Sequence, residues 1–197
     1  MCGCSYKDGN IAFLKSRNQL ISPIGNRITI YDLDNNSSFT PDCGTRSDIE
    51  HIAPTQDSKV VLLIDKDGYS ISVNLEDYKV INHFRFKGKV TDLAFSPNDK
   101  FLAISLEKDI FIYERPKSTI SIEPLILIRK LNIAHGDKIR KVYWSPDSRF
   151  FLSSGEDCIV KMHNLFPLPG WNSSSFLGHR AKNLSAFFSA DMKFCFT

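Results

Sequence analysis

Short apolar segments separated by tight turns recur along this chain every 40–50 residues, and this repeat restricts the possible folds more than any other feature. One full copy, Ala134 to Asn164, has a histidine in a polar loop followed by three apolar segments. The turn after the first segment recurs with spacings of 43, 49 and 44 residues, at Ala53-Pro54, Ser96-Pro97, Ser145-Pro146 and Ser189-Ala190. The ends of the third segments are spaced by 42, 40 and 50 residues, at Tyr31, Val73, Tyr113 and His163. Because the segments alternate with a period of two, the chain is predicted to be all-β, built from copies of one antiparallel sheet.

Repeats of this length that consist of short strands are typical of the blades of a WD-repeat β-propeller. We place the blades at approximately residues 6–43, 44–86, 87–131, 132–177 and 178–197, of which the last is truncated. A ring closes with ~4–8 blades, and an open ring leaves strand edges exposed. We therefore predict that residues 1–197 form an incomplete propeller of about four and a half blades, and that the chain is a fragment or a truncated product.

Composition excludes several classes of protein without selecting one. The net charge of +3 is too small to indicate a nucleic-acid binder by electrostatics alone. No apolar run approaches the ~20 residues of a membrane span, and the first residues do not have the order of a signal peptide. Five scattered cysteines without a C-x-x-C motif indicate neither a disulfide framework nor a zinc site. We expect an intracellular protein without membrane contact, metal, cofactor or small-molecule substrate.

Four polar residues of the copy at 134–164 invite a catalytic interpretation. His135, Ser153 and Asp157 have the composition of a hydrolytic triad. Their spacing, however, resembles the structural tetrad of WD repeats, in which a histidine, a serine or threonine, an aspartate and a tryptophan are hydrogen-bonded. His163 stands where the tryptophan is usual. Since the chain also has no nucleophile-elbow or phosphate-binding motif, we predict a structural tetrad and no enzyme.

Basic residues gather loosely in the second half of the chain, at Arg129, Lys130, Lys138, Arg140, Lys141, Arg180 and Lys182. Such a cluster can contact RNA phosphates, but an ordinary solvated surface is the favoured interpretation because the charge is nearly balanced. Two longer loops, Arg115 to Pro124 and Phe166 to Ser175, are candidates for partner contacts. The alternative, that they are merely tolerated insertions, is equally favoured.

The amino-terminal sequence indicates a family more specifically than the repeat does. YKDGNIAF, followed by LISPIGNRITIYDLDNNSSFT at Leu20 to Thr40, resembles the opening of the periodic tryptophan protein 2 family of WD-repeat proteins. The resemblance continues through IDKDGYSISVNLEDYKVINHFRFKGKVTDLAFSPNDKFLAIS and WSPDSRFFLSS. It covers almost the whole chain from Tyr6 onward and corresponds to the amino-terminal part of the family's first propeller.

The resemblance implies a non-catalytic scaffold for ribosomal RNA processing in the nucleus and nucleolus. The family serves the small-subunit processome, where it helps to dock the small nucleolar ribonucleoprotein and the 5′ external spacer. The implied partners are other processome subunits, precursor ribosomal RNA and small nucleolar RNA, contacted directly or indirectly. Two alternatives stay open: a WD-repeat adaptor of a vesicle coat or ubiquitin ligase, and a hydrolase that uses His135, Ser153 and Asp157.

Overall fold

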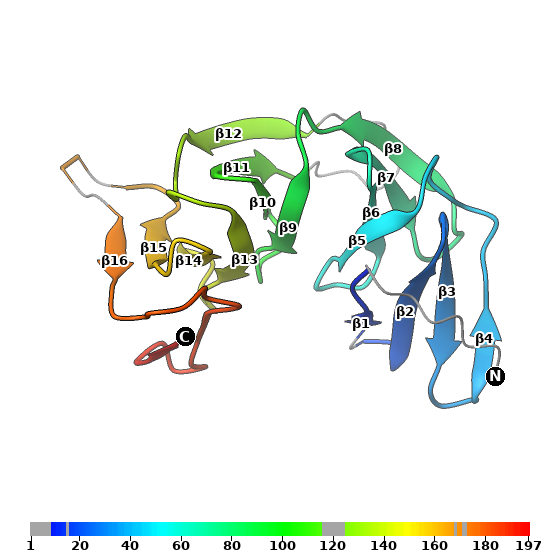
Figure 1. Ribbon diagram of the computed structural model, residues 1–197. Coiled ribbons are helices and arrows are strands. Elements are labelled where there is room, and N and C mark those ends of the chain that lie inside the picture. Colours follow the sequence, from blue (N-terminus) through cyan, green and yellow to red (C-terminus); the bar gives the residue numbers. More distant parts are fainter. Residues whose placement is uncertain (1–8, 15, 116–124, 168, 171–172) are drawn as a thin grey trace. The chain divides into compact units, whose positions relative to one another are not determined.

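A computed structural model describes residues 9–14, 16–115, 125–167, 169–170 and 173–197. In these ranges the regular elements are β-strands, arranged in four antiparallel sheets of four strands and one two-stranded hairpin (Figure 1). The all-β prediction is therefore confirmed. The described residues fall into two compact units. The first comprises the described residues up to Lys89 together with Leu125, and the second comprises Val90–Arg115 and Ile126–Thr197.

The first unit contains two sheets, each formed by consecutive antiparallel strands. We call them blades 1 and 2. Blade 1 has the order β1-β2-β3-β4, with strands Ala12–Leu14, Gln19–Ile24, Arg27–Asp32 and Ser37–Phe39. Blade 2 has the order β5-β6-β7-β8, with strands Ile49–Pro54, Val60–Asp65, Tyr69–Asn74 and Val80–Arg85.

The core of the first unit lies where strands of both of its blades contribute apolar side chains. Every residue of β6 is buried, as expected for a strand with neighbours on both edges and packed side chains on both faces. The first three strands of each blade contribute to one apolar cluster, which includes Leu14, Ile21, Leu63 and Val73. The outer strands β4 and β8 are largely exposed and close each sheet on one side.

The second unit contains blades 3 and 4 and the hairpin β17-β18. Blade 3 has the order β9-β10-β11-β12, with strands Val90–Phe95, Phe101–Leu106, Asp109–Glu114 and Ile126–Leu131. Blade 4 has the order β13-β14-β15-β16, with strands Ile139–Trp144, Phe150–Gly155, Val160–Asn164 and Ser174–Phe176. The hairpin strands are Phe187–Phe188 and Cys195–Phe196.

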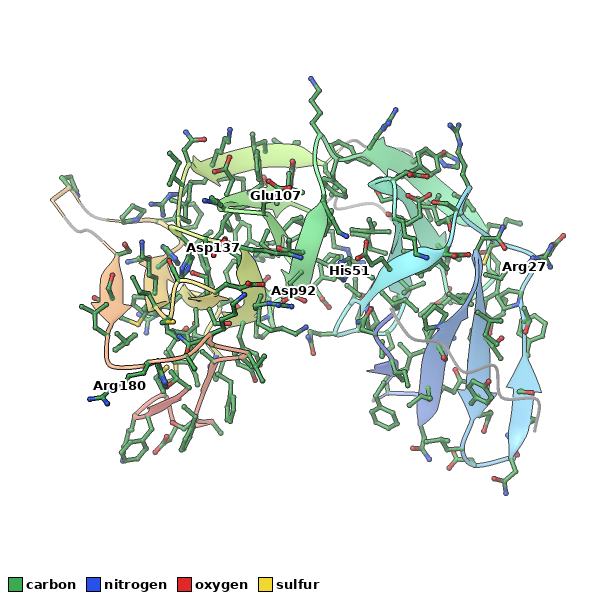
Figure 2. The ribbon with its side chains drawn as sticks, in the orientation of Figure 1. Arg27, His51, Asp92, Glu107, Asp137 and Arg180 are labelled. Carbon is green, nitrogen blue, oxygen red and sulfur yellow. The ribbon has the colours of Figure 1, made fainter. Side chains whose placement is uncertain are left out.

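Blades 3 and 4 are joined through their first strands, which pack against each other. Asp92 of β9 accepts hydrogen bonds from the backbone N–H of Val142 at 2.8 Å and from Lys141 Nζ at 2.7 Å, both from β13. Trp144 Nε1 donates to the carbonyl of Ala94 at 2.9 Å. Figure 2 shows Asp92 among the side chains beside β9. These bonds fix β13 and therefore the rest of blade 4 relative to blade 3.

The turn between the first two strands of blades 2, 3 and 4 and of the hairpin is built in the same way. A hydroxyl accepts a hydrogen bond from the backbone N–H five residues later: Ser145 from Phe150 at 2.9 Å, and Ser96 from Phe101 at 3.0 Å. In blade 2 the hydroxyl belongs to Thr55, which accepts from Val60 at 3.2 Å. The sequence prediction of Ala53 for this position was wrong by two residues, because an alanine resembled the Ser-Pro pattern but has no hydroxyl.

Candidate functional site

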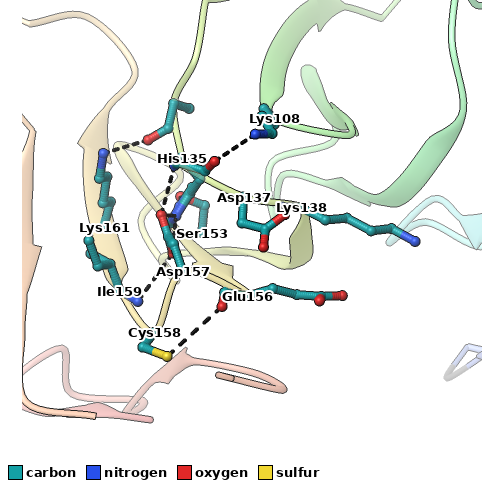
Figure 3. Close-up of polar contacts among 12 residues, drawn as sticks. Lys108, His135, Asp137, Lys138, Ser153, Glu156, Asp157, Cys158, Ile159 and Lys161 are labelled. Atoms are coloured by element: carbon teal, nitrogen blue, oxygen red, sulfur yellow. Dashed lines mark hydrogen bonds and ion pairs between the residues drawn. The ribbon is translucent and has the colours of Figure 1, made fainter. Parts of the chain in front are cut away.

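The four residues of the predicted tetrad are brought together inside blade 4. His135 lies in the loop that enters β13, Ser153 on β14, Asp157 in the β14–β15 turn and His163 on β15. His135 Nε2 is 2.7 Å from Ser153 Oγ, which is 2.9 Å from His163 Nε2. His135 Nδ1 is 3.0 Å from each carboxylate oxygen of Asp157. Figure 3 shows His135 and Ser153 beside Asp157.

The donors of this network follow from the chemistry of its two ends. The Asp157 carboxylate only accepts, so the proton of His135 lies on Nδ1, and the neutral Nε2 accepts from the hydroxyl of Ser153. Ser153 has a single proton to give, so His163 must donate to it through Nε2–H. The result is one chain of hydrogen bonds running from His163 to Asp157, in which each imidazole is neutral.

Burial reinforces the neutral state of both histidines. His135 and Ser153 are fully buried and His163 is 4% exposed. Desolvation lowers the pKa of His163 to about 3, and the nearby positive charges of Lys161 and Arg129 act in the same direction. Desolvation also lowers the pKa of His135, although the Asp157 carboxylate opposes this. Burial alone would raise the pKa of Asp157, but hydrogen bonds led by that from His135 outweigh it and keep the carboxyl ionised.

The loop around His135 is held from several sides. The backbone N–H groups of Gly136 and Ile159 donate to Asp157 at 2.9 and 3.2 Å. Lys161 Nζ donates to the carbonyl of Ala134 at 2.6 Å, and Lys108 Nζ to the carbonyl of Gly136 at 2.7 Å (Figure 3). Since lysines donate to the carbonyls on either side of His135, the backbone that carries its imidazole is held in place.

Two further residues, which the spacing argument did not predict, shape the space around the network. A Cβ on Gly155 would lie 2.6 Å from His135 Nδ1 and 2.5 Å from Asp157 Oδ1, so only glycine leaves room for this pair. Phe151 pairs with His163 across β14 and β15, and their rings stack with centroids 4.9 Å apart. His163 therefore uses its ring face for packing and its Nε2–H for the hydrogen bond, as an indole would. The sequence signal that could have predicted this role is the position of Gly155, two residues before Asp157.

Most of the predicted basic cluster is occupied by contacts within the chain. Arg129 donates to the carbonyls of Asn164 at 2.5 Å and Leu165 at 3.4 Å. Lys130 is 3.6 Å from Asp109 and lies over the Phe111 ring, 5.0 Å from its centroid. Arg129 therefore ties blade 3 to the end of β15, whereas Lys130 makes its contacts within blade 3.

The remaining members behave in two ways. Glu156 binds both Arg140, at 2.6 Å, and Lys182, while Lys141 binds Asp92. Among the described residues, Lys138 and Arg180 have no carboxylate partner, and Figure 2 shows Arg180 projecting away from the second unit. The structure thus divides the seven predicted cations into five held groups and two available ones.

The other predicted sites are placed as follows. Of the candidate contact loops, residues 116–124, 168 and 171–172 lie outside the described residues. Phe166 is exposed and its ring packs edge-on against Phe101 at 5.9 Å. In the described ranges, Cys43, Cys158 and Cys195 are free thiols, and no group of three or more His, Cys, Asp or Glu side chains could hold a metal ion. No helix there is long and apolar enough to cross a bilayer.

Comparison with known proteins supports this arrangement of repeats. The family model described as WD domain, G-beta repeat matches residues 78–114 and 127–164, and the second match contains the whole network. A chain in a crystal structure of a mitotic checkpoint complex matches with a TM-score of 0.74 over 92% of this chain and 55% of that one. At 12% identity this likeness shows the fold alone, which together with the family-model matches is that of a WD-repeat propeller.

The periodic tryptophan protein 2 homolog of Schizosaccharomyces pombe is 35% identical over 100% of this chain. The periodic tryptophan protein 2 of Saccharomyces cerevisiae is 32% identical over the same share, and the Neurospora crassa homolog 31%. This chain is a homologue of periodic tryptophan protein 2. It spans 23% of the length of the fission-yeast relative and 22% of that of the budding-yeast one. The predicted resemblance to periodic tryptophan protein 2 is confirmed along the whole chain.

Proposed function

We propose that this chain is a non-catalytic WD-repeat scaffold in ribosome biogenesis, acting in the nucleolus as part of the small-subunit processome. In this role it presents rigid blades to other processome subunits and helps to dock the small nucleolar ribonucleoprotein and the 5′ external spacer of precursor ribosomal RNA. The observation that carries the proposal is the 31–35% identity with three fungal periodic tryptophan protein 2 sequences over the full chain. Antiparallel blades with short turns suit such work because they hold surface loops in fixed positions.

In this proposal, the network of His135, Ser153, Asp157 and His163 stabilises blade 4 and performs no reaction. A hydrolase requires a nucleophile that a substrate can reach, next to donors that stabilise an oxyanion. Ser153 Oγ is instead fully buried, and both its donor and its acceptor capacity are used by the two imidazoles. Its hydrogen bonds instead join His135 of the entry loop to β14 and β15, which favours a structural role.

Lys138 and Arg180 are the members of the predicted cluster that remain candidates for direct contact with RNA. Both are in the second unit, and neither has a carboxylate partner among the described residues. The other five, Arg129, Lys130, Arg140, Lys141 and Lys182, serve internal contacts in this proposal.

The test is recovery of RNA and protein with the tagged full-length protein from cells, under conditions that keep the processome intact. We expect precursor ribosomal RNA, small nucleolar RNA and other processome subunits to be enriched over a tagged unrelated WD-repeat protein. Enrichment of vesicle-coat or ubiquitin-ligase subunits without these RNAs would refute the proposal in favour of the adaptor alternative. A Ser153→Ala variant that stays folded and loses a measured hydrolytic activity would refute the non-catalytic part.

A further inference from the structure

A basic surface outside the predicted cluster lies at one end of blade 2. The strand β8 ends at Arg85, and the chain continues through Phe86, Lys87, Gly88 and Lys89. Together with Lys66 and Asp67 of the β6–β7 turn, these residues line a surface groove of about 460 Å³. We call the four cations Lys66, Arg85, Lys87 and Lys89 the β8-end surface. All four are exposed.

The charge of this surface is only partly neutralised. Lys66 Nζ is 3.0 Å from a carboxylate oxygen of Asp48, and Lys89 Nζ is 3.5 Å from one of Glu50. Arg85 and Lys87, in contrast, have no carboxylate partner in the part of the chain that the structure describes. Two cations on one groove rim are thus available for an anion.

Aromatic side chains lie on the same face of the sheet as Arg85. Tyr69 of β7 pairs directly with Arg85 of β8, and His83 is two residues before it, so all three side chains project from one face. Tyr69 and His83 are joined by a 2.7 Å hydrogen bond, with ring centroids 5.8 Å apart. The guanidinium of Arg46 lies over the Tyr69 ring at 4.5 Å. His83 is exposed, so its imidazole can take a flat ligand group.

The β6–β7 turn beside the groove is held by backbone hydrogen bonds. Asp65 accepts backbone N–H bonds from Asp67 at 3.0 Å and Tyr69 at 2.9 Å, which fixes the β6–β7 turn. The N–H of Phe86 donates to the carbonyl of Gly68 at 2.9 Å. A Cβ on Gly68 would come within 3.1 Å of the carbonyls of Phe86 and Gly88, so the turn and the residues after β8 are in close contact. The cations therefore extend from a fixed frame.

We propose that the β8-end surface, with His83 beside it, binds single-stranded RNA: Arg85 and Lys87 contact successive phosphates, and a base stacks on the imidazole of His83. Cations that follow a sugar-phosphate backbone next to stackable rings are the usual means of binding single strands. An acidic protein segment would use the cations but not an exposed ring beside them, so RNA is the better fit. The inference deepens the proposed function, since it rests on the presence of RNA in the assembly.

The binding test uses the purified full chain and a fluorescein-labelled oligouridine of about 16 nucleotides, within the site sizes of single-strand binders. We expect Arg85→Ala/Lys87→Ala to weaken binding about tenfold or more at low salt, and to reduce the slope of log affinity against log salt by about 1.4. His83→Ala is expected to weaken binding by about tenfold while leaving the salt slope unchanged, because it removes stacking and no charge.

The control is Lys59→Ala/Lys79→Ala, which removes two exposed lysine charges from the same compact unit but away from the groove; Lys79 Nζ is 3.5 Å from Asp77. We expect it to leave binding within about twofold of the unchanged chain, and Arg85→Lys/Lys87→Arg to retain most of the affinity. Equal losses in the groove and control variants would overturn the proposal. So would an unchanged chain that does not bind the oligouridine, or one that binds a labelled polyglutamate peptide as tightly with the same dependence on Arg85 and Lys87.

The same variants separate this inference from the proposed function. If the tagged Arg85→Ala/Lys87→Ala protein still recovers processome subunits while its crosslinks to RNA are reduced, both proposals stand. A chain that binds oligouridine through the groove but recovers no ribosomal precursor would refute the function and support the surface. A chain that recovers the precursor, with crosslinks that are unaffected by the groove variants, would refute the surface alone.

Discussion

The first three strands of blades 2 and 4 pair in the same way at a constant offset of 90 residues, but the two blades fill the space inside the blade differently. Ile49 pairs with Asp65 where Ile139 pairs with Gly155, and Val61 pairs with Val73 where Phe151 pairs with His163. Even the irregularity in the first strand occurs at the same place in both. The two blades therefore provide a matched comparison of their interiors.

At the tetrad positions the two interiors differ in polarity. Where blade 4 has Ser153 and His163, blade 2 has Leu63 and Val73, both fully buried in the apolar cluster of the first unit. His135 corresponds to Thr45, whose hydroxyl donates to the carbonyl of Ser47 at 2.7 Å. The topology of a blade consequently does not depend on the polar network.

The residue at the end of the second strand shows how each interior is compensated. Blade 2 has Asp65 there, a buried carboxylate that accepts backbone N–H bonds from the following turn. Blade 4 has Gly155, because the His135 and Asp157 side chains occupy the space in which a Cβ would lie. The carboxylate that serves blade 4 is instead Asp157, two residues later. In both blades one carboxylate accepts backbone N–H bonds at this turn, but only in blade 4 does it also orient an imidazole.

The largest expected effect is obtained by placing a polar group in the apolar interior. Leu63→Ser leaves a cavity and buries a hydroxyl without a partner, so we expect a loss of about 4 kcal/mol in the free energy of unfolding. Chemical denaturation of the full chain measures it. The volume-conserving Leu63→Ile should cost less than about 1.5 kcal/mol. Similar losses in both variants would show that blade 2 tolerates a polar group as blade 4 does.

The next effect breaks the network at its anionic end. Asp157→Ala removes the acceptor of His135 Nδ1–H and of two backbone N–H groups, so we expect a loss of about 3 kcal/mol in the free energy of unfolding. The equivalent residue of blade 2, Asp67, is exposed, and Asp67→Ala should change stability by no more than about 0.5 kcal/mol. Equal costs for the two substitutions, measured by the same denaturation, would contradict the role assigned to Asp157.

The pH dependence of stability reports on His163. Its folded pKa of about 3 is below its ordinary value, so the unfolded chain binds more protons, and stability falls as the pH decreases through 6.5 toward 3. Between pH 7 and pH 5 we expect a loss of about 2 kcal/mol from this group. His135, whose pKa is also lowered, adds to the loss in the same direction. Denaturation curves that coincide at pH 7 and pH 5 would exclude buried neutral imidazoles.

The smallest effect is expected from restoring the residue that WD repeats usually have. His163→Trp keeps a ring N–H donor for Ser153 and a flat face for Phe151, so we expect a change of less than about 1 kcal/mol in the free energy of unfolding at pH 7. It should also reduce the loss between pH 7 and pH 5, since one titrating group is gone. If the stability of this variant still fell by the same amount between pH 7 and pH 5, groups other than His163 would be responsible for the loss.

Much of the fold was predictable because strands and turns depend on local chemistry. Alternation in segments such as Arg27–Asp32 and turn residues such as Ser145 and Gly68 indicated the strands and their hairpins. The error at Ala53 arose because a Pro-containing dipeptide marks a turn without specifying which side chain closes it. The spacing also predicted the four network residues, but it did not predict the role of Gly155.

The sequence by itself determined the repeat, the strand order within each sheet and the family. The first two depend on local residue patterns, and the family depends on residue identities that can be compared directly with those of relatives. Only the tertiary structure decided which cations are occupied, because Arg140 and Lys182 meet Glu156, and Lys141 meets Asp92, across tens of residues. It also decided that Arg85 and Lys87 line one groove, and that Arg85 shares a face of the sheet with Tyr69 and His83. Whether a side chain is available depends on its partners in space, and a sequence does not show those partners.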